Sequence, residues 1–413
     1  MFKEKYLKKI TLLANMVIVV FIFFVFALPV ITLTGCAGDK VAAGGKGQTV
    51  EGLHDTRHTQ NGGNGVSLKE VPQSNRENNE EGEQLKEGNS YPDNLNEAGN
   101  NAGEEQYKFL SKEELLKFKP NELGGVMVLM YHQIGYPESE WVRTPENFRK
   151  DLLNLYQKGY RLVSLLDYIS GDINVEAGKS PVIITFDDST QNHLNFIEKA
   201  DGDGYEIDPD CAVAILEDFY NNHPDSGRGA TFYIYYPNPF RQEKYIKDKF
   251  EFLVSRGYEI GNHTYSHADL SLLDDEDIVK EIALNAMEVS NSIKGYEVRS
   301  LALPYGNYPG NKSILASGEY MGYSYTNEAV LLIGSNPAPS PFSIDLDPLA
   351  VPRIRASEIK VEGQGLYDWL DYFDACPEKR YISDGDSKVI TAPRELMDKI
   401  NRKAVANRKV YFY

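Results

Sequence analysis

Cysteine is scarce in this sequence, which contains three among its 413 residues. Exported domains that depend on a disulfide framework are much richer in cysteine, so the chain is not a disulfide scaffold. One bridge between Cys211 and Cys376 stays open, because the sequence alone does not decide whether they pair. The third cysteine, Cys36, lies in a different context near the N-terminus.

Basic side chains are in the minority, with 43 Lys and Arg against 61 Asp and Glu and a formal net charge of −18 at pH 7. Nucleic acids and anionic membrane surfaces are bound through clusters of Lys and Arg. The charge balance therefore argues against a nucleic-acid partner. It is compatible with a neutral glycan.

An apolar run from about Leu12 to Leu33 follows a start that carries several lysines. The run is long enough to span a bilayer. It ends in Leu33-Thr34-Gly35-Cys36, which resembles the bacterial lipobox, where the signal is removed and the cysteine is lipidated. We predict that residues 1–36 are a lipoprotein-type signal peptide with lipidation at Cys36, or alternatively a retained membrane helix. Either anchor places the rest of the chain outside the cytoplasm, on a bacterial cell membrane.

Residues 37–105 lack apolar periodicity and contain one aromatic residue, Tyr91. Such a segment cannot bury enough apolar surface to offset its ordering entropy, so we predict a disordered linker. From residue 106 to residue 413 the composition becomes globular, which predicts one large domain.

Short apolar runs alternate with helical patterns through residues 106–413. The alternation predicts an α/β fold with a parallel sheet or barrel, because helices would cover both faces of the strands. Helices are predicted at 145–158, 211–221, 244–256, 275–293 and 367–373. Strands are predicted at 126–131, 161–164, 182–186, 230–235, 259–261, 300–303 and 351–354.

Polar side chains follow four of these predicted strands. The carboxyl ends of parallel strands meet on one face of an α/β barrel, where active sites lie, so we expect these side chains to form one site. In chain order they are His132, the pair Asp187-Asp188, the segment His263–His267 and the segment Pro304-Tyr305-Gly306.

Three segments carry a resemblance to a known family: Thr185–Asp188, His263–His267 and Pro304–Gly306. They resemble the first three motifs of the polysaccharide deacetylases, the NodB-homology family or carbohydrate esterase family 4. The resemblance extends from about Val126 to Tyr305, and more loosely to Ala356. It implies a distorted (β/α)7-type barrel. It also implies a metal-dependent hydrolase that removes N-acetyl groups from polysaccharides containing N-acetylglucosamine.

By the family pattern, Asp188, His263 and His267 bind a divalent metal and Asp187 is the catalytic base. Two imidazoles and one carboxylate leave coordination positions open for water and a substrate oxygen. A metal in such a site lowers the pKa of bound water and polarises a carbonyl, which amide hydrolysis requires. Zinc is the expected metal, and iron, cobalt or nickel suit the same ligands.

The sequence departs from the family pattern in three places. Ser189 stands where a glycine usually follows the acidic pair. An insertion at about residues 191–228 is interpreted as a lid or a specificity element, and its His193 and His223 are expected on the surface. No histidine follows His267, although most members carry a late histidine that protonates the leaving amine.

His132 can take that role because the sequence resembles the branch that deacetylates poly-N-acetylglucosamine, in which the barrel is circularly permuted. Arg353 resembles a late arginine of that branch and would orient Asp187, with Arg299 as a weaker substitute. In the expected mechanism Asp187 deprotonates water, the metal and the Tyr305 backbone N–H stabilise the oxyanion, and His132 protonates the departing nitrogen.

Two alternative functions stay open. An O-acetyl sugar esterase would use the same metal and need less help from His132, because a sugar alkoxide leaves more readily than an amine. A tethered glycan-binding protein without catalysis is the second alternative, because the late histidine is missing. Whether the polysaccharide belongs to the cell wall or to an exopolysaccharide is not decided by the sequence.

Overall fold

The computed structural model describes residues 107–202 and 204–413. The predicted signal or anchor segment (1–36) and the predicted linker (37–105) lie outside the described residues. Among the residues that are described, no helix has the length and apolar character needed to cross a bilayer.

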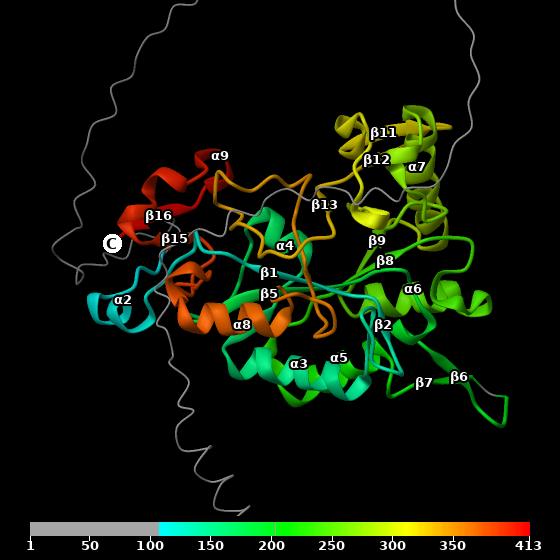
Figure 1. The fold of residues 1–413 in the computed structure, drawn as a ribbon, viewed down its shortest axis with the longest axis horizontal. Helices are drawn as coiled ribbons and strands as arrows, with labels where there is room; N and C mark the ends of the chain where they lie inside the picture. Colours follow the sequence, from blue (N-terminus) through cyan, green and yellow to red (C-terminus); the bar gives the residue numbers. More distant parts are fainter. Residues whose placement is uncertain (1–106, 203) are drawn as a thin grey trace, which may run out of the picture. The chain divides into compact units, whose positions relative to one another are not determined.

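A parallel sheet of eight strands forms the centre of the described chain (Figure 1). Seven strands run in the order β13-β10-β9-β8-β5-β1-β14, and the short strand β4 pairs with β5. The bounds are β1 Met127–Tyr131, β4 Tyr160–Leu162, β5 Ser180–Phe186, β8 Thr231–Ile234, β9 Glu259–Asn262, β10 Ser300–Ala302, β13 Ala329–Leu331 and β14 Ile354–Arg355. The parallel α/β architecture predicted from the sequence is confirmed.

The sheet curls, and residues 351–355 join its two edges. Val351 forms a parallel bridge with Leu331 at the end of β13, and Ile354 pairs with Leu129 of β1. One short stretch of chain therefore contacts both ends of the seven-strand path. The result is a NodB-like α/β barrel, as expected.

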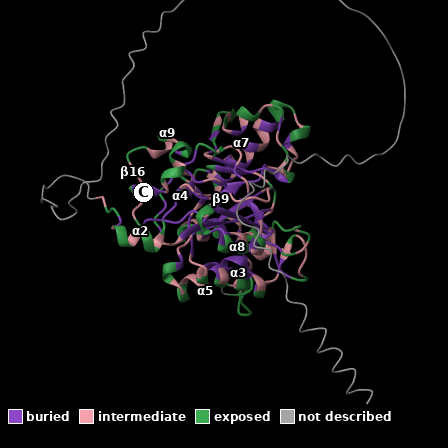
Figure 2. Ribbon diagram, turned by 60° about the vertical axis from the view of Figure 1, so that its left-hand side comes forward, coloured by how far each residue is buried: buried purple, intermediate pink, exposed green. Residues whose placement is uncertain are grey.

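Helices cover the outside of the sheet, and the strands form the buried interior (Figure 2). The helix α3 shows how the sequence sets a boundary: the Thr144 hydroxyl accepts a hydrogen bond from the Asn147 N–H, and Pro145 occupies the first turn. The longer helices are α3 Pro145–Gln157, α5 Ala212–Asn222, α6 Ile246–Ser255, α7 Asp275–Ser292 and α8 Leu366–Ala375. The shorter ones are α2 Lys112–Phe118, α4 Leu165–Ser170 and α9 Arg402–Val405.

Successive residues of a strand pack into two different buried layers. Leu129 and Tyr131 of β1 belong to the larger apolar cluster with the covering helices, whereas Val128 belongs to a second cluster. Every residue of β5 is buried. Because both faces are covered, these strands appear in the sequence as continuous apolar runs.

Several elements were not predicted. The predicted strand at 351–354 begins later, at Ile354, because Pro352 has no N–H to donate to a ladder. The helices α2, α4 and α9 were also missed. The missed strands are β13, the short pair β2 Gln133–Ile134 and β3 Val142–Arg143, the hairpins β6 Phe196–Glu198/β7 Tyr205–Ile207 and β11 Ser317–Tyr320/β12 Tyr323–Thr326, and the parallel pair β15 Val389–Ala392/β16 Lys409–Phe412.

Residues 191–228 contain the β6–β7 hairpin, which projects from the sheet (Figure 1), and the helix α5. The helix packs on α3, where the Phe219 ring lies 6.0 Å from the Tyr156 ring. It is therefore one of the helices that cover the barrel. Cys211, at its N-terminus, is buried and free, so it does not pair with Cys376.

Candidate active site

The strand register brings the predicted site residues to one edge of the sheet. Tyr131 of β1 is level with Phe186 of β5, so the residues that follow them, His132 and Asp187, leave the sheet together. Two strands further along, Asn262 ends β9, and His263 follows it. His132, Asp187 and His263 therefore all follow strand ends at the same edge of the sheet.

Asp188, His263 and His267 offer ligand atoms that all lie within 4.8 Å of one another. Asp188 Oδ1 is 3.4 Å from His263 Nε2 and 3.1 Å from His267 Nε2. Separations near 3 Å are those of atoms that bind a common ion at about 2 Å. The three residues therefore fit a divalent metal.

The second ring nitrogen of His263 fixes which atom is free for a metal. Its Nδ1 lies 2.8 Å from the Ala302 carbonyl oxygen, and a carbonyl oxygen only accepts, so Nδ1 carries the proton. In the neutral ring, Nε2 is then the unprotonated nitrogen, and it faces Asp188. Metal-binding histidines are commonly oriented by such a bond.

The loops that carry these ligands adopt unusual backbone conformations. Left-handed φ angles are rare for residues with a Cβ and cluster at functional sites. They occur here at Asp188 (74°), Ser189 (41°), Thr264 (59°), His267 (59°) and Tyr305 (60°).

Asp187 is held by Arg353 in a buried bidentate ion pair. Asp187 Oδ1 accepts from Nη1 at 2.7 Å and Oδ2 accepts from Nη2 at 2.6 Å. The guanidinium also donates from Nε to the Leu332 carbonyl at 2.8 Å and from Nη1 to Thr185 Oγ1 at 3.1 Å. Burial would raise the pKa of Asp187, but Arg353 and His263 outweigh it and lower the pKa.

Arg299, the weaker substitute considered for this role, binds elsewhere. Its Nε donates to Glu328 Oε1 at 2.6 Å in an exposed pair. Arg353 is therefore the arginine that contacts Asp187, as the sequence favoured. Tyr305, the predicted oxyanion donor, is 59% exposed, and its ring lies 5.0 Å from the His267 ring at the mouth of the site.

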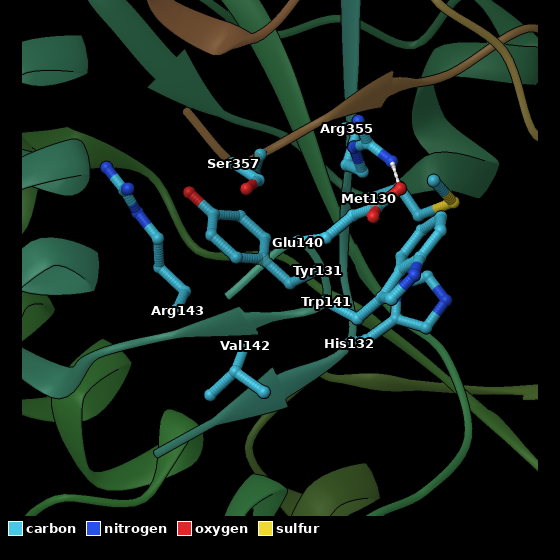
Figure 3. Close-up of a pocket in the computed structure, with 10 residues that line it drawn as sticks. Met130, Tyr131, His132, Glu140, Trp141, Val142, Arg143, Arg355 and Ser357 are labelled. Carbon is cyan, nitrogen blue, oxygen red and sulfur yellow. Dashed lines mark hydrogen bonds and ion pairs between the residues drawn. The ribbon is translucent and has the colours of Figure 1, made fainter. Parts of the chain in front are cut away.

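His132 lies beside the exposed indole of Trp141, with the two ring centroids 4.7 Å apart (Figure 3). Burial lowers the pKa of His132, while Asp187 and Asp188 oppose that effect. The Arg355 guanidinium lies over the Trp141 ring, 4.8 Å from its centroid. The sequence did not single out Trp141, because one tryptophan in a loop carries no local pattern.

A groove of about 350 Å³ begins beside Trp141 and Arg355. It shares Met130, Trp141 and Arg355 with the smaller pocket that reaches His132. Its other lining residues are Ile333, Gly334, Ser335, Lys360, Val361, Glu362 and Gln364. The lining mixes apolar, amide and charged groups.

The surface position predicted for His193 is wrong. Its side chain is fully buried, and its ring packs 5.1 Å from the Phe186 ring. No local pattern indicates this burial, because His193 follows a polar stretch and its apolar neighbours Phe186 and Phe232 come from the strands β5 and β8. His223 is half-buried near the end of α5, and its ring lies 4.7 Å from the Tyr156 ring.

Residues 174–326 match the family model of the polysaccharide deacetylases. Among solved structures, the chain is similar to the Streptococcus pyogenes deacetylase PplD in complex with acetate, at 19% identity and a TM-score of 0.44 over 60% of this chain and 97% of that one. It is also similar to BC0361, a polysaccharide deacetylase from Bacillus cereus, at 20% identity and a TM-score of 0.41 over 58% of this chain and 67% of that one. A third similar structure is IcaB from Ammonifex degensii, at 18% identity and a TM-score of 0.38 over 57% of this chain and 93% of that one. No curated protein matches the chain. The matched residues, 174–326, contain the Thr185–Asp188, His263–His267 and Pro304–Gly306 segments, so this part of the chain is similar to the polysaccharide deacetylases in both its overall sequence and its motifs.

Proposed function

We propose that this domain is a metal-dependent hydrolase that removes N-acetyl groups from a polysaccharide containing N-acetylglucosamine. One observation carries the proposal: Asp187, held by Arg353, lies next to a potential metal ligand set, and His132 follows the neighbouring strand at the same edge. A base, a metal site and an acid are the groups that hydrolysis of an unactivated amide requires.

The metal would be held by Asp188, His263 and His267, and zinc is the first choice for this donor set. When bound there, it would supply Lewis-acid polarisation of the acetamide carbonyl and acidify water. The protein residues account for the proton transfers. Asp187 accepts a proton from water through an oxygen lone pair that Arg353 does not occupy. His132 delivers a proton to the departing sugar nitrogen, and the Tyr305 N–H supports the oxyanion.

A polymeric substrate is favoured by the groove that leads away from His132. The acid has to contact the sugar nitrogen, so the reacting sugar lies on the His132 side and its neighbour extends over Trp141. Amide and charged groups beside an apolar surface suit a sugar, which presents hydroxyls at its rim and C–H groups on its faces. We also propose that the chain belongs to the permuted branch that deacetylates poly-N-acetylglucosamine, because His132 follows the early strand β1 and no histidine follows His267.

We also propose that the protein is anchored outside the cytoplasm by a lipid on Cys36. The support is the sequence Leu33-Thr34-Gly35-Cys36 after an apolar run. Metabolic labelling with a palmitate analogue should mark the wild type and leave a Cys36→Ser variant unlabelled. Equal labelling of both would exclude this anchor.

The first experiment is acetate release by the purified protein, stripped of metal and then given zinc or cobalt. The substrates are N-acetylglucosamine oligomers, peptidoglycan and an O-acetylated sugar. Metal-dependent acetate from an N-acetylated glycan supports the proposal. Acetate from the O-acetyl substrate alone would identify an esterase, and tight glycan binding without acetate would identify a binding protein.

The metal ligands are tested by His263→Ala. Removing one of three ligands should weaken zinc binding by more than roughly 100-fold, since the loss of residues that merely orient a ligand already costs 10- to 100-fold. Titration with equimolar zinc measures the effect. His223→Ala is the matched control, because His223 packs against Tyr156 and Phe219 away from the ligands. Retention of zinc and activity in His263→Ala would show that the ligand assignment is wrong.

A further inference from the structure

His193 connects the strand end that carries His132 to the loop that carries the acidic pair. It belongs to the short 3₁₀ turn η1 Gln191–His193, just after Asp187 and Asp188 in the chain. Its Nε2 contacts the backbone carbonyl oxygen of His132. The side chain is completely buried.

This contact adds one more link between the end of β1 and the loop after β5, just beyond the last hydrogen bond between the two strands. The last rung of the ladder is the bond from the Asp187 N–H to the Tyr131 carbonyl, at 2.9 Å. One residue later, the His132 carbonyl accepts from the His193 side chain instead of from a strand. A buried carbonyl without a donor is costly, so this bond fixes the backbone of His132 against the β5 loop.

The protonation state of His193 follows from its partner. Because a carbonyl oxygen only accepts, Nε2 must carry the proton. Nδ1 is buried and has no hydrogen-bond partner among the residues that the structure describes. Burial also lowers the pKa of His193 to about 4. The ring is therefore neutral and donates only through Nε2, and it packs against the stacked rings of Phe186 and Phe232.

We propose that His193 is a positioning residue for acid catalysis: it holds His132 at a fixed place relative to Asp187 and the metal ligands. This role rests on the proposed function, in which His132 protonates the leaving nitrogen. Small displacements of a catalytic group reduce the rate strongly, so a buried tether at the backbone of the acid matters for catalysis. His193 itself does not contact the substrate.

Two variants separate the hydrogen bond from the shape of the side chain. His193→Phe places an apolar ring beside the stacked pair Phe186 and Phe232 and removes the hydrogen-bond donor. His193→Gln is the matched control, because the Gln Nε2 can occupy nearly the place of the histidine Nε2 and donate to the same carbonyl.

Two substrates separate positioning of the acid from general damage. An N-acetylglucosamine oligomer loses an amine, which needs a proton from His132. 4-Nitrophenyl acetate loses a phenolate, which leaves without one. We expect His193→Phe to lower kcat on the oligomer about tenfold or more with little change in KM, since a positioned acid contributes 10²- to 10⁴-fold. Ester hydrolysis and zinc content should stay near wild type, and His193→Gln should retain most of the oligomer activity.

The ratio of oligomer rate to ester rate is independent of the fraction of folded enzyme, so partial misfolding of a variant does not obscure the result. In a His132→Ala background, His193→Phe should cause no further loss in that ratio. Equal losses on both substrates, an additive loss in that background, or an unchanged ratio would each overturn the proposal. A wild type that hydrolyses the ester but no N-acetylated glycan would instead refute the proposed function, and this role of His193 with it.

Discussion

At the scale of single residues, the site depends on a buried charge pair. Arg353 has no exposed side-chain surface, and Asp187 is 2% exposed. Removing one partner of such a pair is expected to cost about 3–5 kcal/mol, because the other charge is left uncompensated. The pair therefore makes two contributions: each charge compensates the other in the interior, and Arg353 keeps Asp187 ionised.

Arg353→Lys tests the second contribution. A lysine keeps the positive charge but cannot bind both carboxylate oxygens, so the pKa of Asp187 should rise towards its ordinary value. A base with a raised pKa is protonated up to a higher pH, so the acid limb of the kcat/KM profile should move to higher pH. The measurement is the pH–rate profile from pH 4 to 8. Arg299→Lys, which alters only the exposed pair with Glu328, should leave the profile unchanged.

Ser189 is a second residue with a specific expectation. Its φ of 41° is left-handed, and its buried Oγ has no hydrogen-bond partner within the described residues. Ser189→Gly removes the buried hydroxyl, and glycine adopts the left-handed conformation without strain. The substitution should therefore raise the free energy of unfolding by about 1 kcal/mol. Urea denaturation measures the change. Ser189→Ala keeps the Cβ, so its gain should be smaller, and an equal gain would show that backbone conformation is not the cause.

At the scale of elements, the helix α6 carries a lysine inside the core. Lys249 is fully buried, and its ammonium donates to the Phe240 carbonyl at 3.1 Å. Burial lowers the pKa of Lys249 to about 7. The neighbouring thiol of Cys211 supplies no counter-charge at neutral pH, because burial raises its pKa.

The consequence is a stability that depends on pH. Between pH 7 and about 10, the unfolded chain holds a proton on Lys249 that the folded chain has released, so stability should rise with pH in this window. We expect Lys249→Met to remove that rise and to stabilise the protein at pH 7 by roughly 4 kcal/mol. Urea unfolding at pH 7 and pH 9 measures both effects. Lys247→Met, an exposed change on the same helix, should leave both the stability at pH 7 and its rise with pH unchanged.

At the scale of the whole molecule, buried carboxyl groups connect the first residues of the described domain to its C-terminal part through hydrogen bonds. Glu122 accepts hydrogen bonds from the Asp384 and Thr391 N–H groups, at 3.2 and 3.0 Å. Asp384 Oδ2 accepts from the Thr391 hydroxyl at 2.5 Å. Burial raises the pKa of Asp384 to about 6 and raises that of Glu122 well above its usual value.

A carboxyl group with a raised pKa stabilises the fold in its protonated form. The contribution of Asp384 is present below its unfolded pKa of about 4 and is lost as pH rises through 6. Asn has nearly the same shape as Asp without the charge. The free energy of unfolding of Asp384→Asn should therefore rise relative to that of the wild type by about 2 kcal/mol as the pH increases from 4 to 7. Thermal or urea unfolding across this range measures the gain. If the exposed change Asp398→Asn gives the same gain, net charge is the cause instead.

The sequence by itself determined a parallel α/β sheet or barrel with polar residues just after several strands, from apolar runs of strand length and helical spacing between them. The choice of Asp188, His263 and His267 as potential metal ligands came from the resemblance of these segments to the polysaccharide deacetylases. The register of neighbouring strands then places those residues at one edge, as Tyr131 and Phe186 illustrate. The weakest local signals belong to short elements such as β13, which has three residues.

Only the tertiary structure decided which distant side chains contact one another. Arg353 reaches Asp187 across 166 residues of sequence because residues 351–355 join the two edges of the sheet. His193 is buried because a turn that is polar in sequence is placed against Phe186 and Phe232. Trp141 meets His132 because a short pair of strands folds back over the end of β1. Such contacts depend on how the sheet curls and closes, and no local pattern in the chain encodes that closure.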